Sequence, residues 1–151
     1  MLFKQTSRTD PEQVFIVCRN VSGAAVSAGK AVEWDVETSS DGNAVTQCKS
    51  GSVAGLFAGI TDPAGGALAD SAYGLVQVYG YCASAYCSFV SSNSLIAPGQ
   101  FLKPVSGNLR EGTMSALTTS GHIWVSLMET PGASAAGHSA VSYRPVFIRA
   151  L

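Results

Sequence analysis

The chain has 151 residues, with nine basic and ten acidic side chains and a formal net charge of −1. That length suits one domain with a sizeable core, and charges scattered singly argue against the basic surface that nucleic-acid binding requires. Only 13% of the residues are charged, about half the usual share. The composition therefore favours a protein that buries part of its surface in an assembly.

Residues 1–13 show no hydrophobic periodicity, and we expect them to form a short N-terminal arm before a β-domain over 14–151. The arm has no signal-peptide pattern, and no apolar run along the chain reaches the ~20 residues that cross a membrane. We therefore expect a protein made in the cytoplasm, with no membrane partner. Residues 14–18, which are strong β-formers, predict the first strand.

Residues 31–37 alternate between apolar and acidic side chains. Val32, Trp34 and Val36 share one face, and Glu33, Asp35 and Glu37 share the other. This pattern predicts a half-buried strand with a solvated acidic face. Residues 53–60 are small and apolar on both faces, which predicts a strand packed tightly between neighbours.

Residues 73–81 place Tyr73, Leu75, Gln77, Tyr79 and Tyr81 on one side of a strand, with Val76 and Val78 on the other. Residues 86–90 are the expected hairpin partner, joined through the short link at 82–85. Residues 122–128 alternate again, with Ile123, Val125 and Leu127 inward. In the last strand, 141–149, Pro145 removes a ladder donor, so the strand should lie at an edge or end at a bulge.

Turn signals rich in Gly, Pro, Asn and Asp separate these runs, and residues 130–140 form a low-complexity stretch expected to be a loop. Strands at short intervals with such punctuation predict an all-β, single-domain β-sandwich or β-barrel. One internal echo exists: residues 26–32 and 96–102 both follow the pattern apolar-x-x-Gly-x-x-apolar. It fits a repeated β-corner, and it also fits chance.

Residues that carry chemistry are few. His122 and His138 are the only histidines, no hydrolase nucleophile elbow occurs, and metal-binding and phosphate-binding motifs are missing. We therefore expect no enzyme activity, no cofactor and no metal. Cys18, Cys48, Cys82 and Cys87 are interpreted as reduced, buried thiols. A disulfide between Cys82 and Cys87, close in sequence, stays open as an alternative.

Tyrosines offer the best candidate binding surface. Tyr73, Tyr79, Tyr81 and Tyr86 lie close together in sequence and are of the residue type that stacks on sugars and anchors protein interfaces. Cross-strand aromatic packing within the sheet is the competing interpretation.

Several phrases along the chain resemble the head decoration, or cement, proteins of tailed bacteriophages. They are the polar arm before VFIV at 14–17, the V-x-x-G-x-x-V segment at 26–32, GLFAGITD at 55–62, YGLVQVYG at 73–80 and IAPGQFLKP at 96–104. The resemblance implies a homotrimer that binds the major capsid protein on the capsid exterior of the virion and bridges neighbouring capsomers without chemistry.

A partner can be reached from both ends of such a chain, by an apolar arm or by an edge strand that joins a neighbouring sheet. The candidate contact residues are Leu2, Phe3, Val14 and Phe15 at one end, and Tyr143, Val146 and Phe147 at the other. Two other functions remain as alternatives: a carbohydrate- or receptor-binding β-module that uses the tyrosines, and a small hydrolase.

Overall fold

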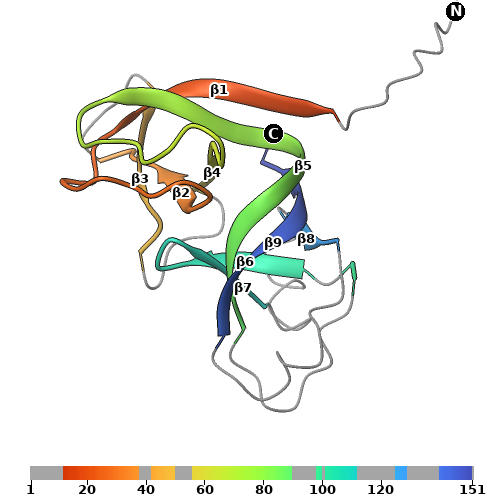
Figure 1. The fold of residues 1–151 in the computed structure, drawn as a ribbon. Coiled ribbons are helices and arrows are strands. Elements are labelled where there is room, and N and C mark those ends of the chain that lie inside the picture. The colour runs from red at the N-terminus through yellow and green to blue at the C-terminus, as the bar shows by residue number, and fades with distance from the viewer. Residues whose placement is uncertain are drawn as a thin grey trace, which may run out of the picture.

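The computed structural model describes residues 12–37, 42–49, 56–89, 98–99, 101–111, 125–128 and 140–150. These residues form strands and connecting turns and contain no α-helix, so the predicted all-β class is confirmed (Figure 1). The strands are β1 (Gln13–Asn20), β2 (Ala31–Trp34), β3 (Ala44–Gln47), β4 (Phe57–Thr61), β5 (Tyr73–Phe89), β6 (Phe101–Val105), β7 (Asn108–Glu111), β8 (Val125–Leu127) and β9 (Ala140–Arg149). The predicted arm lies outside the described residues as far as residue 11.

The sheet closes on itself twice around β5. Its strand order is β1-β3-β2-β4-β5-β7-β6-β8-β9, and both β1 and β9 also pair with β5. The pairing β1–β5 closes a ring of β1 to β5, and the pairing β5–β9 closes a ring of β5 to β9. We call these rings the first barrel and the second barrel. The long β5 is shared, because its first half belongs to one ring and its second half to the other.

Each barrel has its own hydrophobic interior. Small and β-branched side chains fill the first: Cys18, Val26, Val32, Val45, Ala58, Val76 and Val78. The second holds larger residues, among them Phe89, Leu102, Leu109, Leu127 and Ile148. Ala31, Phe57 and Ile60 belong to first-barrel strands but join this second cluster. The two barrels are therefore packed against each other through a common apolar region.

The two barrels have the same topology. In the first, β1 pairs in parallel with β3, and the other four pairings of the ring are antiparallel. In the second, β5 pairs in parallel with β7, and the other four are again antiparallel. Replacing β1 to β5 by β5 to β9 in chain order converts one ring into the other. The sheet is thus a tandem repeat of one five-stranded unit.

The predicted hairpin at 82–90 is wrong. Residues Tyr73–Phe89 form one strand of 17 residues, and its irregularity between Cys82 and Ala85 is a bulge against β9 rather than a chain reversal. The physical reason is that both halves of β5 have other partners. Strands β1 and β4 pair with the first half, and β7 and β9 pair with the second. Pro145 lies opposite this bulge, between Arg144 and Val146, but β9 neither ends there nor lies at an edge beyond it, because it continues to Arg149 and pairs with β5 and β8.

The predicted acidic strand at 31–37 is also partly wrong. Strand β2 ends at Trp34, Glu33 is buried, and Val36 is 63% exposed. Strand β2 pairs with both β3 and β4, and the side of β2 that carries Glu33 also carries Ala31, which packs in the second core cluster. A central strand covered on both faces has no solvated side. The inward positions predicted for Val125 and Leu127 are confirmed, whereas 122–124 and 130–139 lie outside the described residues.

Candidate partner-binding face

Strands β1, β5 and β9 share one side of the sheet, which faces solvent except at Gln77, a residue buried between Leu75 and Tyr79. In an antiparallel pair, directly opposed residues point to the same side, and the opposed pairs here include Val17–Leu75, Arg19–Tyr73 and Tyr81–Phe147. We define the outer face by the outward residues of these strands. They are Val14, Phe15, Val17, Arg19, Tyr73, Leu75, Tyr79, Tyr81, Phe147 and Arg149.

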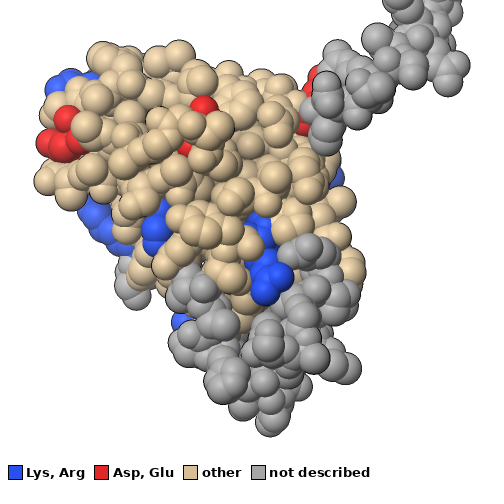
Figure 2. Space-filling model, in the orientation of Figure 1, with Lys and Arg blue, Asp and Glu red and all other residues tan. Residues whose placement is uncertain are grey.

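The outer face is apolar and open in its first-barrel half. Val17 is 61% exposed, Tyr73 63% and Leu75 45%. None of its ten residues is acidic, and its charges are the exposed Arg19 and Arg149. Figure 2 shows one side of the molecule, on which uncharged residues predominate and Lys and Arg form separate patches, some of them near the middle of the view. Exposed aromatic and arginine side chains of this kind are typical of protein-binding surfaces.

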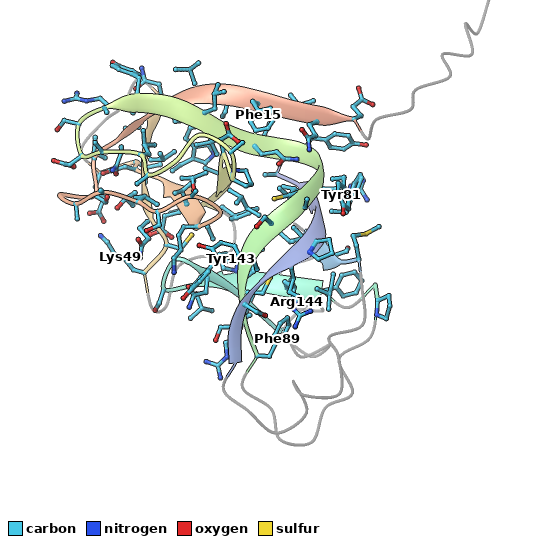
Figure 3. All side chains as sticks on the ribbon, viewed as in Figure 1. Phe15, Lys49, Tyr81, Phe89, Tyr143 and Arg144 are labelled. Carbon is cyan, nitrogen blue, oxygen red and sulfur yellow. The ribbon has the colours of Figure 1, made fainter. Side chains whose placement is uncertain are left out.

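The structure brings together residues that the sequence assigned to opposite ends of the chain. Val14 is opposed to Tyr79 across β1 and β5, and the rings of Tyr79 and Phe147 meet edge to face with centroids 5.4 Å apart. Figure 3 labels Phe15 on β1 and Tyr81 near the crossing of β5 and β9. The two predicted contact ends are thus parts of one surface, because both strands pair with β5.

The predicted tyrosine group divides into two parts. Tyr73, Tyr79 and Tyr81 belong to the outer face, whereas Tyr86 packs edge to face on Tyr143 with centroids 5.2 Å apart. The Nζ of Lys30 lies 3.3 Å from the centroid of the Tyr86 ring and donates to Oδ1 of Asn108 at 2.8 Å. Burial lowers the pKa of Lys30. The second group is therefore a packed junction between the two barrels, with only Tyr143 widely exposed, at 53%.

One predicted contact residue is wrong, and two lie outside the described residues. The side chain of Val146 is buried in the second barrel, so it cannot touch a partner. The prediction placed Val146 and Phe147 on one surface, but the period of two in a strand turns Val146 inward and Phe147 outward. Leu2 and Phe3 lie outside the described residues.

Sequence reasoning missed the most exposed apolar residues of the face. Val17 was placed in the predicted first strand, and Leu75 was placed on the same side of its strand as Tyr73, Tyr79 and Tyr81, but neither was named as a contact residue. The alternation of side chains along a strand could have identified Val17 as exposed, because Val17 lies on the same side of β1 as Arg19. An arginine two residues away on one strand face indicates solvent on that face.

The strand pairings limit where another chain can add a strand. Residues Val146–Ile148 of β9 pair with both β5 and β8, so that segment has no free edge. Strand β1 pairs with β5 from Gln13 to Arg19 but with β3 only at Arg19 and Asn20. Among the described residues, the edge of β1 from Gln13 to Cys18 that faces away from β5 has no paired strand.

A cleft adjoins the outer face at Tyr73 and Leu75. It has a volume of about 350 Å³ and is lined mainly by Gly, Ala and Leu residues of the loop between β4 and β5 and of the start of β5. Asp62 is its only acidic residue, and its carboxylate accepts the backbone N–H of Ala64 at 2.9 Å. The lining residues include no histidine or cysteine.

The four thiols are free and buried. Burial raises the pKa of Cys18 to about 11 and that of Cys87 to about 12, and it also raises the pKa of Cys82. For Cys48, burial together with the nearby Glu33 charge raises the pKa further. Thiols held in their neutral form inside a core are poor nucleophiles.

Within the described ranges, no three His, Cys, Asp or Glu side chains gather as they would around a metal ion, and no helix is long and apolar enough to cross a membrane. No protein-family model matches the chain, and no curated protein is significantly similar to it.

Proposed function

We propose that this chain is a decoration, or cement, protein of a tailed-phage head, which binds the major capsid protein on the outer surface and bridges neighbouring capsomers as a homotrimer. The observation that carries the proposal is the outer face, an exposed apolar and aromatic surface on a paired, rigid sheet. A protein whose role is to adhere to a lattice needs such a surface and no catalytic group.

Repetition supplies the affinity in this proposal. Each outer face offers modest apolar contacts, and many copies on one shell act together through avidity. Since the face carries Arg19 and Arg149 and no acidic residue, its complement on the shell should be apolar with carboxylates at the margin. Apolar burial should then dominate, so added salt should weaken binding only slightly.

Co-sedimentation with purified heads that lack the protein tests the proposal. Wild-type protein should pellet with heads in moderate and high salt, and Val17→Asp should abolish pelleting. Val17 is 61% exposed, so the substitution places a charge on the contact surface without disturbing the core. Ala25→Asp is the matched control, because Ala25 is exposed in the loop between β1 and β2. Wild-type protein that never pellets with heads contradicts the proposal.

A carbohydrate- or receptor-binding module is the second candidate, and the cleft beside Tyr73 is the observation that favours it. An exposed tyrosine ring can stack on a sugar, and Asp62 in the same cleft can accept its hydroxyl groups. A glycan array separates the two functions. Specific sugar binding that Tyr73→Ala removes would support the module, and binding to heads alone would support decoration.

A further inference from the structure

The two loops that lead into β2 and β6 are equivalent, and each has a glycine at the same place. Gly29 has φ 75° and Gly99 has φ 82°. The N–H of Gly29 donates to the carbonyl of Thr61 at 3.1 Å, and that of Gly99 donates to the carbonyl of Leu127 at 2.7 Å. Thr61 and Leu127 are themselves equivalent, since they pair with Val76 and Val146 in the two rings. Gly29 and Gly99, the glycines of the echo at 26–32 and 96–102, therefore occupy equivalent positions in the two rings.

The first of these loops joins the two barrels. The carbonyl of Gly29 accepts the N–H of Tyr86 at 2.8 Å. A Cβ on Gly29 would lie 2.6 Å from the carbonyl oxygen of Ser84 and 3.1 Å from the ring of Tyr143. Gly29 is buried in this contact. The glycine loop of the first barrel thus docks on a corner of the second barrel, where β5 and β9 meet.

The register identifies the same corner on the first barrel. Tyr86 opposes Tyr143 across β5 and β9, and Arg19 opposes Tyr73 across β1 and β5. Val17, two residues before Arg19, corresponds to Ser84, two residues before Tyr86. This first-barrel corner is uncovered, with Val17 61% and Tyr73 63% exposed. The equivalent loop, Pro98 and Gly99, is exposed as well.

Within one chain, the Gly29 loop is thus docked on the second-barrel corner. The equivalent loop, Pro98 and Gly99, and the equivalent corner, Val17 and Tyr73, are both exposed. We propose that copies of this chain associate head to tail, with the Pro98–Gly99 loop of one copy docked on the Val17–Tyr73 corner of the next. Such a contact joins two different surfaces, so it closes into a ring or continues as a filament. The proposal does not rest on capsid binding, because it concerns the purified chain alone. A docked copy would cover Val17 and Tyr73, which leaves Val14, Tyr79 and Phe147 of the outer face for contact with a shell.

The contact between copies should be weaker than the one within a copy. Arg19 has the position on the first-barrel corner that Tyr86 has on the second-barrel corner. The contact of Lys30 with the aromatic ring of Tyr86 is therefore not repeated between copies. The N–H of Arg19 already donates to the carbonyl of Asn43 at 2.9 Å, so the hydrogen bond to the glycine carbonyl is not repeated either. Packing of the loop on Val17 and the Tyr73 ring remains, which predicts reversible, concentration-dependent association.

A side chain at Gly99 tests the contact without disturbing the fold. A Cβ there meets no atom within 4 Å in the chain itself, whereas the equivalent Gly29 shows that the docked loop has no room for one. Gly99→Asn suits the test because asparagine tolerates positive φ. The matched control is Gly42→Asn, since Gly42 has φ 72° and equally open space. Sedimentation velocity over a concentration series measures association, and circular dichroism verifies the fold of each variant.

We expect wild type and Gly42→Asn to associate alike, and Gly99→Asn to dissociate at least about tenfold more readily. Tyr73→Ala, on the other half of the contact, should weaken association in the same direction. Mixing Gly99→Asn with Tyr73→Ala should restore pairing, because each retains the half that the other lacks, though neither can extend beyond two copies. A wild-type chain that stays monomeric at its highest soluble concentration overturns the proposal, as does a folded Gly99→Asn that associates like wild type.

Discussion

The first and second barrels share a topology, but few of their equivalent positions carry the same type of residue. Trp34 corresponds to Pro104, Gln77 to Phe147 and Asn20 to Cys87, as their positions in the two registers show. Two kinds of position are alike in both: inward β-branched residues such as Val76 and Val146, and the loop glycines Gly29 and Gly99. Strand pairing and turn geometry therefore specify this unit, while even fully buried equivalent positions such as Asn20 and Cys87 accept different side chains.

The divergence is greatest where the barrels face different surroundings. Ala31, Phe57 and Ile60 point out of the first barrel but are covered by the second, so they are apolar. The outer face at Val17 and Leu75 is apolar yet uncovered. Apolar side chains on the outside of a barrel are explained in the first case by a contact within the chain. In the second case, a contact with another molecule would explain them in the same way.

The largest effect is expected at the glycine where β5 passes from one barrel to the other. Gly80 has φ 97°, and a Cβ there would clash with the carbonyl oxygen of Glu12. Gly80→Ala should therefore lower the free energy of unfolding by roughly 3 kcal/mol or more. Gly42→Ala, at positive φ but in open space, should cost only about 1 kcal/mol.

Thiol labelling read by mass spectrometry shows whether that damage reaches both barrels. Cys18 reports on the first and Cys87 on the second. Because β5 is shared, both thiols should become reactive together in Gly80→Ala. Labelling of one cysteine while the other stays protected would contradict the idea that the two barrels unfold as one unit.

Alkaline pH should destabilise the protein through the same two thiols. Their folded pKa values exceed the ordinary value of 9.0, so the stabilisation is complete below pH 9 and is lost as pH rises through the folded pKa. Cys87 alone should contribute a loss of about 1.4 kcal/mol for each pH unit above 9. Urea unfolding above pH 9 should show that the free energy of unfolding falls less steeply with pH in Cys87→Ala than in wild type. The decline due to Cys18 should level off near pH 11 and that due to Cys87 near pH 12. Equal slopes in Cys87→Ala and wild type would show that the thiol ionises freely in the folded state.

Substitutions at equivalent core residues show whether the two barrels unfold together. Val76 and Val146 are both fully buried at matched positions, so Val76→Ala and Val146→Ala should each cost roughly 2 kcal/mol. Calorimetry should show a single unfolding transition in both variants, with the midpoint temperature lowered by a similar amount in each. Two separated transitions, or a shift in only one variant, would mean that the barrels are independent.

The smallest effect is expected at the matched surface tyrosines. Tyr143 packs on the Tyr86 ring, so Tyr143→Ala should lower stability by about 1 kcal/mol. Tyr73 is opposed by Arg19 instead of a ring, and Tyr73→Ala should change stability by less than about 0.5 kcal/mol. Chemical denaturation of the monomer measures both. A larger loss for Tyr73→Ala would show that this ring serves the fold rather than a partner.

The sequence predicted the fold class and the alternation of Val125 and Leu127 because both follow from a period of two. It failed at 82–90 and at Glu33, where the partner strand rather than the local pattern decides. A strand long enough to serve two barrels looks, in sequence, like two strands joined by Ala and Ser. The echo at 26–32 and 96–102 was visible, but its meaning depends on pairings between residues far apart. Likewise, only the shared β5 unites Val14 with Phe147 into one face.

Cross-strand nuclear Overhauser effects along β5 show whether one strand serves both barrels. We predict contacts between the backbones of Phe15 and Gln77 and between those of Tyr81 and Phe147 in the same sample, matching the two registers. Contacts of Tyr81 or Cys82 with Tyr86 across a tight turn, with none to Phe147, would mean that β5 is a hairpin. That result would contradict the shared strand, the repeated barrel and the outer face together.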